Sequence, residues 1–214
     1  MGKLRVYVPP SPLRLLEHVL ESPALVRAVR ELPPAALGKL IDAIGLEDAG
    51  ELVALATTSQ LEAVFDEDLW KPKRPGADPD FDPARFGLWL QVLGEAGEKA
   101  IVERLCELPV DLLILAVTRL ALVVDMDELW VELSDDEEAL ELTEKAIDGV
   151  LAEEIEEFRL FSRDDAHFDV LVSALTSLDR DHSALLRQIL EKAAAVSSEY
   201  IRYNGGLYDV LTGE

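Results

Sequence analysis

Apolar residues recur every three or four positions along most of this chain, which is the spacing of helices that bury one face. The first two such stripes cover residues 13–20 and 25–29. Each stripe follows a serine–proline pair, at 11–12 and 22–23, in which the serine caps a helix and the proline occupies its first position. The pattern therefore predicts two short helices near the start of the chain.

The same periodicity continues toward the C-terminus with short interruptions. We predict further helices over residues 34–44, 47–56, 59–65, 83–93, 98–107, 109–122, 168–178 and 181–203. Connections of a few residues favour antiparallel neighbours. A Leu-Pro pair opens the helices that follow both Glu31 and Glu107, so the chain carries a loose repeat. We therefore predict an all-α fold, an irregular α-superhelix made of a solenoid-like, helical-repeat array of short antiparallel helices with a long C-terminal helix.

Residues 71–83 interrupt the helical pattern, because four prolines and a glycine in this stretch favour a loop. We expect an N-terminal helical repeat region over residues 1–70, this Pro-rich loop, and a second helical region over residues 84–214. Together they are predicted to form one continuous domain. Residues 210–214 resemble the beginning of another helix, which favours a fragment of a longer protein.

Residues 125–157, called the acidic segment below, combine dense negative charge with apolar residues. They contain fifteen acids against one base, Lys145, which is a net charge of −14 out of −23 for the whole chain. A disordered acidic tail would lack the leucines and isoleucines interleaved here, so we expect folded structure. Ser134 and Glu137 form a capping-box pattern, and helical spacing continues over residues 147–160.

The overall composition, with 49% hydrophobic and 29% charged residues, is that of a globular protein. Because Cys106 is the only cysteine, the chain can form neither an internal disulfide nor a cysteine-rich zinc site. The apolar neighbours of Cys106 favour a buried structural thiol. The first residues lack the apolar run of a signal peptide. The longest apolar run, residues 112–124, contains Arg119 and is too short to span a bilayer. We expect a cytoplasmic protein. Residues 123–133 are compatible with a short extended segment.

Residues 32–70 (LPPAALGKLIDAIGLEDAGELVALATTSQLEAVFDEDLW) carry several short motifs: Leu-Pro helix starts, Glu-Asp-Ala at another start, and Gln-Leu followed by Asp-x-Asp-Leu-Trp. With the helix that begins at Asp82-Pro83, these motifs resemble a family of uncharacterised bacterial proteins. The helical repeats of that family look like the cytosolic N-terminal domain of MgtE-type magnesium transporters. The resemblance covers about residues 30–125 and implies a right-handed helical superhelix with no known activity.

Two groups of residues suggest chemistry but have simpler interpretations. Asp78, Asp80 and Asp82 begin like a calcium loop, yet the required glycine and glutamate are missing, so Asp82 is better interpreted as a helix cap. Aspartates flank His167 and His182, which suits metal binding or acid–base catalysis. Both histidines nevertheless stand at predicted helix starts, where aspartate serves as a cap.

The acidic segment has the strongest functional interpretation, although the same residues also suit a solvated helical face. Glutamates at four-residue spacing repel each other, and a basic partner or cations would relieve that repulsion. We therefore predict a non-enzymatic protein–protein interaction or scaffold module whose acidic surface docks a basic protein partner. The predicted partner-binding residues are Asp135, Asp136, Glu137, Glu138 and Glu141.

Two other functions remain open from the sequence. The alternative is a divalent-cation (Mg²⁺) responsive regulatory domain with carboxylate ligands, and the third is an uncharacterised hydrolase-type enzyme. No catalytic residue is predicted, and no cofactor apart from the Mg²⁺ of the alternative. The net charge argues against nucleic acid and direct membrane insertion. A homo-oligomer is also possible, because basic residues of the N-terminus can pair with the acidic segment of another copy. These bases are Lys3, Arg5, Arg14, Arg27 and Arg30.

Overall fold

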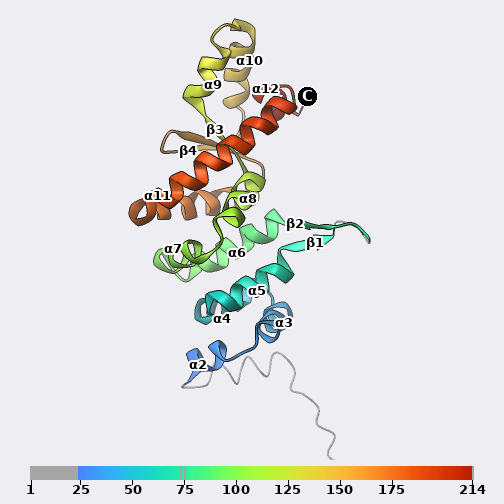
Figure 1. Ribbon diagram of the computed structural model, residues 1–214, viewed down its shortest axis with the longest axis vertical. Helices are drawn as coiled ribbons and strands as arrows, with labels where there is room; N and C mark the ends of the chain where they lie inside the picture. The colour runs from blue at the N-terminus through green and yellow to red at the C-terminus, as the bar shows by residue number, and fades with distance from the viewer. Residues whose placement is uncertain (1–23, 73, 75, 214) are drawn as a thin grey trace, which may run out of the picture. The chain divides into compact units, whose positions relative to one another are not determined.

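The computed structural model describes residues 24–72, 74 and 76–213 (Figure 1). The structure is mostly helical, at 72%, with eleven α-helices among the described residues. The chain divides into two compact units, Met1–Phe81 and Asp82–Glu214. The helix starts predicted at 11–12 and 22–23 lie outside the described residues.

The first unit is a set of short helices followed by a hairpin. Its elements are α2 (Leu25–Arg30), α3 (Pro34–Ile44), the 3-10 turn η1 (Glu47–Ala49), α4 (Gly50–Leu55), α5 (Thr58–Asp68), β1 (Trp70–Pro72) and β2 (Pro79–Phe81). Thr57 begins α5 through a capping box with Gln60. The buried Gln60 amide also donates to the carbonyl oxygens of Val29 at 2.9 Å and Leu32 at 2.7 Å. One side chain therefore ties the start of α5 to the end of α2.

The hairpin of β1 and β2 lies where the sequence predicts only a Pro-rich loop. Trp70 and Phe81 are partners in the antiparallel register, and their rings meet edge to face with centroids 5.6 Å apart. Pro72 pairs with Pro79 at the end of this two-stranded sheet, a place where proline is tolerated. This cross-strand aromatic contact thus stabilises a hairpin among residues whose composition favours a loop.

The second unit begins with helices that confirm the predicted pattern. They are α6 (Pro83–Glu95), α7 (Glu98–Glu107) and α8 (Val110–Leu120). Asp82 caps α6, because its Oδ1 accepts a hydrogen bond from the backbone nitrogen of Arg85 at 3.0 Å. Trp89 on α6 has no exposed surface, so it is a core residue as its apolar neighbours indicate.

A three-stranded antiparallel sheet is the second departure from the predicted all-α fold. The strands β3 (Ala121–Asp125), β4 (Ala152–Ile155) and β5 (Phe158–Ser162) lie in the order β3-β5-β4. The helix predicted over residues 147–160 is therefore wrong. Ile155 and Phe158 are three positions apart, as on a helix, but they are cross-strand partners on either side of a tight turn. A helix and a hairpin would both bring Ile155 and Phe158 together, so the spacing of this apolar pair does not distinguish a helix from a hairpin.

The helices α9 (Met126–Leu133) and α10 (Glu137–Ile147) form most of the acidic segment. Asp125 caps α9 and Asp136 caps α10, each accepting at 3.0 Å from the backbone nitrogen three residues later. The predicted capping box at Ser134 is wrong. Ser134 ends α9 instead, and its hydroxyl donates to the carbonyl oxygen of Val131 at 2.8 Å.

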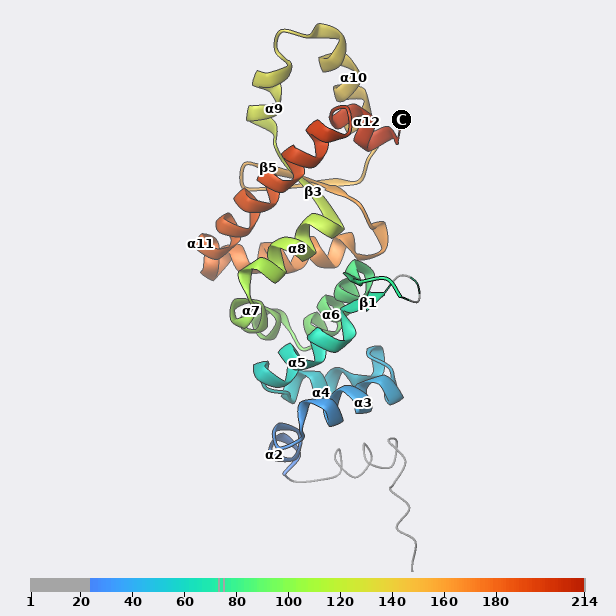
Figure 2. The same cartoon turned by 45° about the vertical axis from the view of Figure 1, so that its right-hand side comes forward.

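The long helix α11 (Asp165–Tyr203) confirms the predicted long C-terminal helix and joins two predicted helices into one. It bends at His182, whose φ of −136° and ψ of 36° are not helical. After α11 the chain turns at Gly205, with φ of 90°, and continues as the short α12 (Leu207–Thr212). The C-terminal half of α11 crosses the three-stranded sheet (Figure 2).

The acidic segment rests on a core shared by the sheet, α10, α11 and α12. The buried residues of this core are Leu122, Val124, Ile147, Phe161, Ile201 and Leu207. The hydroxyl of Ser197, buried on α11, accepts a hydrogen bond from the backbone nitrogen of Val123 at 3.1 Å. The helix therefore covers a backbone donor at the outer edge of β3, an edge that would otherwise be free to pair with another strand.

Candidate functional site

A cleft of about 680 Å³ opens in the second unit, between the acidic segment and the C-terminal half of α11. Its apolar lining includes Leu129 and Leu133 of α9, Leu142 of α10, Ile201 of α11 and Leu207 of α12. Four helices, two from the acidic segment and two from the C-terminal end of the chain, therefore contribute apolar side chains to a single concave surface. Pockets of this size bind small molecules or the anchor side chains of a peptide.

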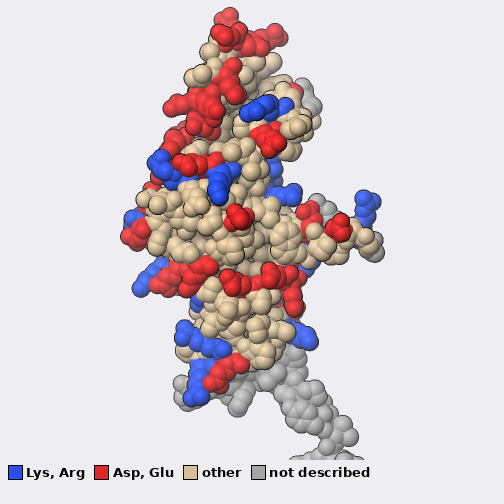
Figure 3. Space-filling model, viewed as in Figure 1, with Lys and Arg blue, Asp and Glu red and all other residues tan. Residues whose placement is uncertain are grey.

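Acidic side chains surround this apolar lining. The cleft's acids are Asp125, Glu128, Glu132, Glu191 and Asp209, and Arg202 is the one base among its lining residues. Figure 3 shows acidic side chains gathered over α9 and α10. The combination of apolar lining and negative rim favours a ligand that carries apolar groups between positive charges.

The helix α9 forms one wall of the cleft and is only partly packed. It contains no buried residue. Met126, Leu129 and Trp130 pack on the core while remaining partly exposed, and Val131 on the other side is 74% exposed. The neighbouring α10 by contrast buries Thr143, Ala146 and Ile147. The apolar stripe of an amphipathic helix faces the core, and because that of α9 is only partly covered, α9 presents apolar surface that another molecule can cover.

The predicted partner-binding residues lie beside the cleft, with none of them in its lining. Asp135 and Asp136 are exposed in the connection between α9 and α10, and Glu137 and Glu138 are exposed in the first turn of α10. Asp136 also has a structural role as the cap of α10. These four acids extend the negative surface outward from the rim.

Glu141, the fifth predicted residue, forms an exposed ion pair along α10. Its Oε1 accepts from Lys145 Nζ at 2.7 Å. This hydrogen bond and the attraction of the opposite charges lower the pKa of Glu141, and the same two causes raise the pKa of Lys145. The only base of the acidic segment is therefore already engaged, which leaves Arg202 of α11 as the one base at the cleft.

The acids of the cleft itself are only partly identified by the sequence. Asp125, Glu128 and Glu132 belong to the acidic segment, and the last two stand next to Leu129 and Leu133 on α9. That alternation of glutamate and leucine is a signal for an acidic wall with apolar contacts. Glu191 and Asp209 give no such signal, because only the fold brings α11 and α12 to the cleft.

The two histidine groups do not come together at this site. The Nδ1 atom of His167 lies 2.7 Å from Asp164 Oδ2, and Asp164 also caps α11. The His167 ring lies so close to Gly87 of α6 that a side chain at that position would collide with it. His182 lies exposed at the bend of α11. His167 therefore has structural contacts with Asp164 and α6, and neither histidine lines the cleft.

The described residues show neither a metal-binding cluster nor a membrane-spanning helix. Among them, no group of three or more His, Cys, Asp or Glu side chains converges in a way that could hold a metal ion. None of the described helices combines the length and apolar character needed to cross a membrane. Cys106 is partly buried. Burial is the main cause of a raised pKa of its thiol, and the negative charge of Glu107 raises this pKa further.

Comparison with known proteins identifies a family but no characterised relative. A family model described as "Family of unknown function (DUF6178)" matches residues 4–201. No curated protein and no solved structure matches the chain. The match confirms the expectation of an uncharacterised family, whereas the resemblance to the MgtE cytosolic domain stays a prediction.

Proposed function

The chain belongs to the DUF6178 family of unknown function, and we propose that it is a non-enzymatic interaction or scaffold module that binds a basic, amphipathic segment of a partner protein. The binding site is the cleft between α9, α10 and α11. The observation that carries this proposal is the incompletely packed α9 beside an apolar, acid-rimmed cleft. An amphipathic helix that inserts its apolar face into such a groove is a common mode of peptide recognition.

The chemistry of the cleft defines the partner segment. Leu129, Leu133 and Leu142 offer contacts to aliphatic or aromatic side chains. The volume of about 680 Å³ holds a few anchor side chains, which usually supply most of the binding energy of an interface. Lysine or arginine residues next to these anchors meet Glu128 and Glu132 at the rim. The partner is thus expected to alternate apolar anchors with basic residues on one helical face.

The exposed acids from Asp135 to Glu141 act mainly at longer range. They raise the local concentration of a basic partner and speed its association, an effect that salt screens. Neutralising them should slow association with little change in dissociation, whereas changes inside the cleft should speed dissociation. This difference separates steering by the outer acids from binding by the cleft.

A fluorescein-labelled amphipathic peptide of leucine and lysine is a suitable probe, with binding measured by fluorescence anisotropy. Leu133→Gln on the cleft side of α9 should weaken binding about tenfold, because a polar amide replaces an apolar contact. Val131→Gln is the matched control, since Val131 is 74% exposed and does not line the cleft. The proposal fails if both substitutions have the same effect, or if a leucine–glutamate peptide binds equally well.

The Mg²⁺-responsive alternative, which goes with the MgtE resemblance, stays a prediction and is tested by a separate experiment. Melting temperature is measured in MgCl₂ and in NaCl of equal ionic strength. An ion that binds the folded state stabilises it by mass action, by about 2.7 kcal/mol at a hundred times its dissociation constant. Stabilisation by Mg²⁺ well beyond that by Na⁺ would favour the alternative. Equal stabilisation would indicate screening alone.

A further inference from the structure

A second surface lies on the opposite flank of α11. With about 100° between successive helix residues, Val196, Tyr200 and Tyr203 fall on one side of α11, and Ser198 and Arg202, which line the cleft, fall on another. The helix face between the two sides is buried. The three side chains are 49%, 45% and 84% exposed respectively. They form an apolar and aromatic stripe that α11 presents independently of the cleft.

Arg163 lies over this stripe in a fixed position. Its guanidinium carbon stands 4.3 Å from the centroid of the Tyr200 ring. Its Nη1 donates to the carbonyl oxygen of Thr118 at 3.1 Å, and its backbone nitrogen donates to the carbonyl oxygen of Leu120 at 2.9 Å. The end of α8 and the Tyr200 ring therefore hold the side chain on two sides. Only one of the five guanidinium N–H donors is used by these contacts.

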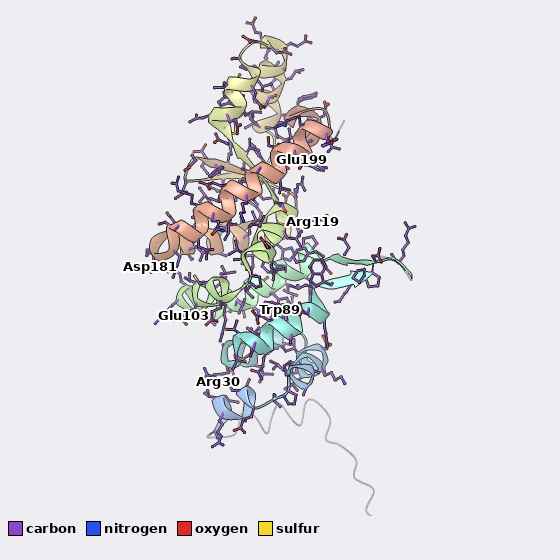
Figure 4. All side chains as sticks on the ribbon, viewed as in Figure 1. Arg30, Trp89, Glu103, Arg119, Asp181 and Glu199 are labelled. Atoms are coloured by element: carbon purple, nitrogen blue, oxygen red, sulfur yellow. The ribbon has the colours of Figure 1, made fainter. Side chains whose placement is uncertain are left out.

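Arg163 has no carboxylate partner within the described part of the chain, although the protein has 43 acidic and 20 basic residues. Desolvation lowers the pKa of Arg163, Tyr200 raises it, and the positive charge of nearby Arg119 lowers it. The side chain remains charged at neutral pH, because arginine titrates far above it. Figure 4 labels Arg119 at the end of α8 and Glu199 on the stretch of α11 that carries the tyrosines.

The Arg163 side chain is exposed, and the guanidinium N–H donors not used by Thr118 can form charge-assisted hydrogen bonds with an incoming oxyanion. We propose that Arg163, stacked on Tyr200, binds a carboxylate or phosphate group of an anionic peptide segment, whose apolar residues cover Val196 and Tyr203. Arginine suits this role because its planar fork offers two parallel hydrogen bonds to such a group. The surface is chemically opposite to the acidic cleft, so one helix would hold a basic partner on one flank and an anionic one on the other.

The test uses a fluorescein-labelled peptide in which glutamate alternates with leucine and phenylalanine. A second version carries phosphoserine at the glutamate positions and a third carries glutamine. The two anionic peptides distinguish carboxylate from phosphate as the preferred group, and binding of either in an Arg163-dependent manner supports the proposal. Equal binding of the glutamine peptide, or no binding of both anionic peptides, would overturn it.

Arg163→Gln should weaken binding of the anionic peptide about tenfold, because it removes a charge-assisted hydrogen bond. Because this change also removes the hydrogen bond to Thr118, Tyr203→Ser provides a second variant at a residue that is 84% exposed. It should weaken binding several-fold with an unchanged melting temperature. Arg180→Gln is the matched control. Arg180 lies on the N-terminal half of α11, away from the stripe, and pairs with Glu98 of α7.

If Arg163→Gln and Arg180→Gln reduce the affinity equally, only the net charge matters and the proposal is wrong. If Tyr203→Ser leaves the affinity unchanged, the stripe does not contact the peptide and the proposal is equally wrong. The cleft variant Leu133→Gln should bind the anionic peptide as the wild type does. Failure of this second surface therefore leaves the proposed function of the cleft untouched, and the reverse also holds.

Discussion

The two helices of the acidic segment, α9 and α10, have similar sequences but different packing. Both begin with a capping aspartate and two acids in the first turn, and both alternate leucine with glutamate. The helix α10 buries three residues and contributes Ile147 to the core, whereas α9 buries none. We therefore base the proposed binding surface on the incomplete burial of an apolar face rather than on negative charge, which the two helices share. An incompletely buried apolar face leaves contact area that the fold itself does not use.

Core substitutions should show the largest difference between the two helices. Ile147→Ala on α10 should lower the free energy of unfolding by about 2–5 kcal/mol, since it leaves a cavity in the shared core. Leu129→Ala on α9 should lower it by less than about 1 kcal/mol, because Leu129 is already partly exposed. Urea denaturation followed by circular dichroism measures both. Equal losses of stability would mean that α9 is as much a part of the core as α10.

The two capping aspartates sharpen the comparison at a smaller scale. Asp136→Ala should reduce global stability by about 1 kcal/mol, since α10 is packed and its fraying disturbs the core. Asp125→Ala removes a cap of the same geometry from α9. Its expected effect is faster amide hydrogen exchange in α9 with little change in global stability. A larger global loss from Asp125→Ala than from Asp136→Ala would reverse the assignment.

The ion pair of α10 should have the smallest effect. Because Lys145 lowers the pKa of Glu141, the pair is formed at neutral pH, weakens as acid protonates Glu141, and weakens again at high pH as Lys145 loses its proton. Both side chains are exposed, so global stability should hardly change. Lys145→Met should raise the pKa of Glu141 in a carbon-detected NMR titration. An unchanged pKa would show that the pair is absent in solution.

Much of the helical structure follows from local signals in the sequence. Asp82 followed by proline marks the start of α6, and the apolar spacing of residues 98–107 gives the bounds of α7. Such features depend on residues a few positions apart, so they are visible without the fold. The same reasoning indicates that the acidic segment is folded, because its leucines recur at helical spacing.

The hairpins could not be identified in this way. Ile155 and Phe158 satisfy a helical spacing, yet the turn between them is a tight hairpin in which Glu156 adopts a φ of 53°. Long-range pairing of β5 with β3 decides between the two structures, and local spacing contains no information about it. Trp70 and Phe81 likewise pair across residues that otherwise favour a loop.

The cleft was only partly foreseeable for a related reason. The sequence shows where negative charge is concentrated, but it does not show that Glu191 and Asp209 join the rim from α11 and α12. Nor does it separate α9 from α10, since burial depends on which neighbours cover each helix. Arg163 and Tyr200 are 37 positions apart in the sequence printed above, and only the packing of α11 beside β5 brings their side chains together.

Hydrogen exchange with mass spectrometry, with and without the leucine–lysine peptide, tests the central claim most directly. In the free protein, the amides of α9 should exchange faster than those of α10, because no buried residue holds α9 in place. Addition of the peptide should slow exchange in α9 and in the facing part of α11. The effect on α10 should be smaller, because its buried residues already protect its amides in the free protein. Equal protection of α9 and α10 in the free protein, or protection by the peptide anywhere except at the cleft, would contradict the account.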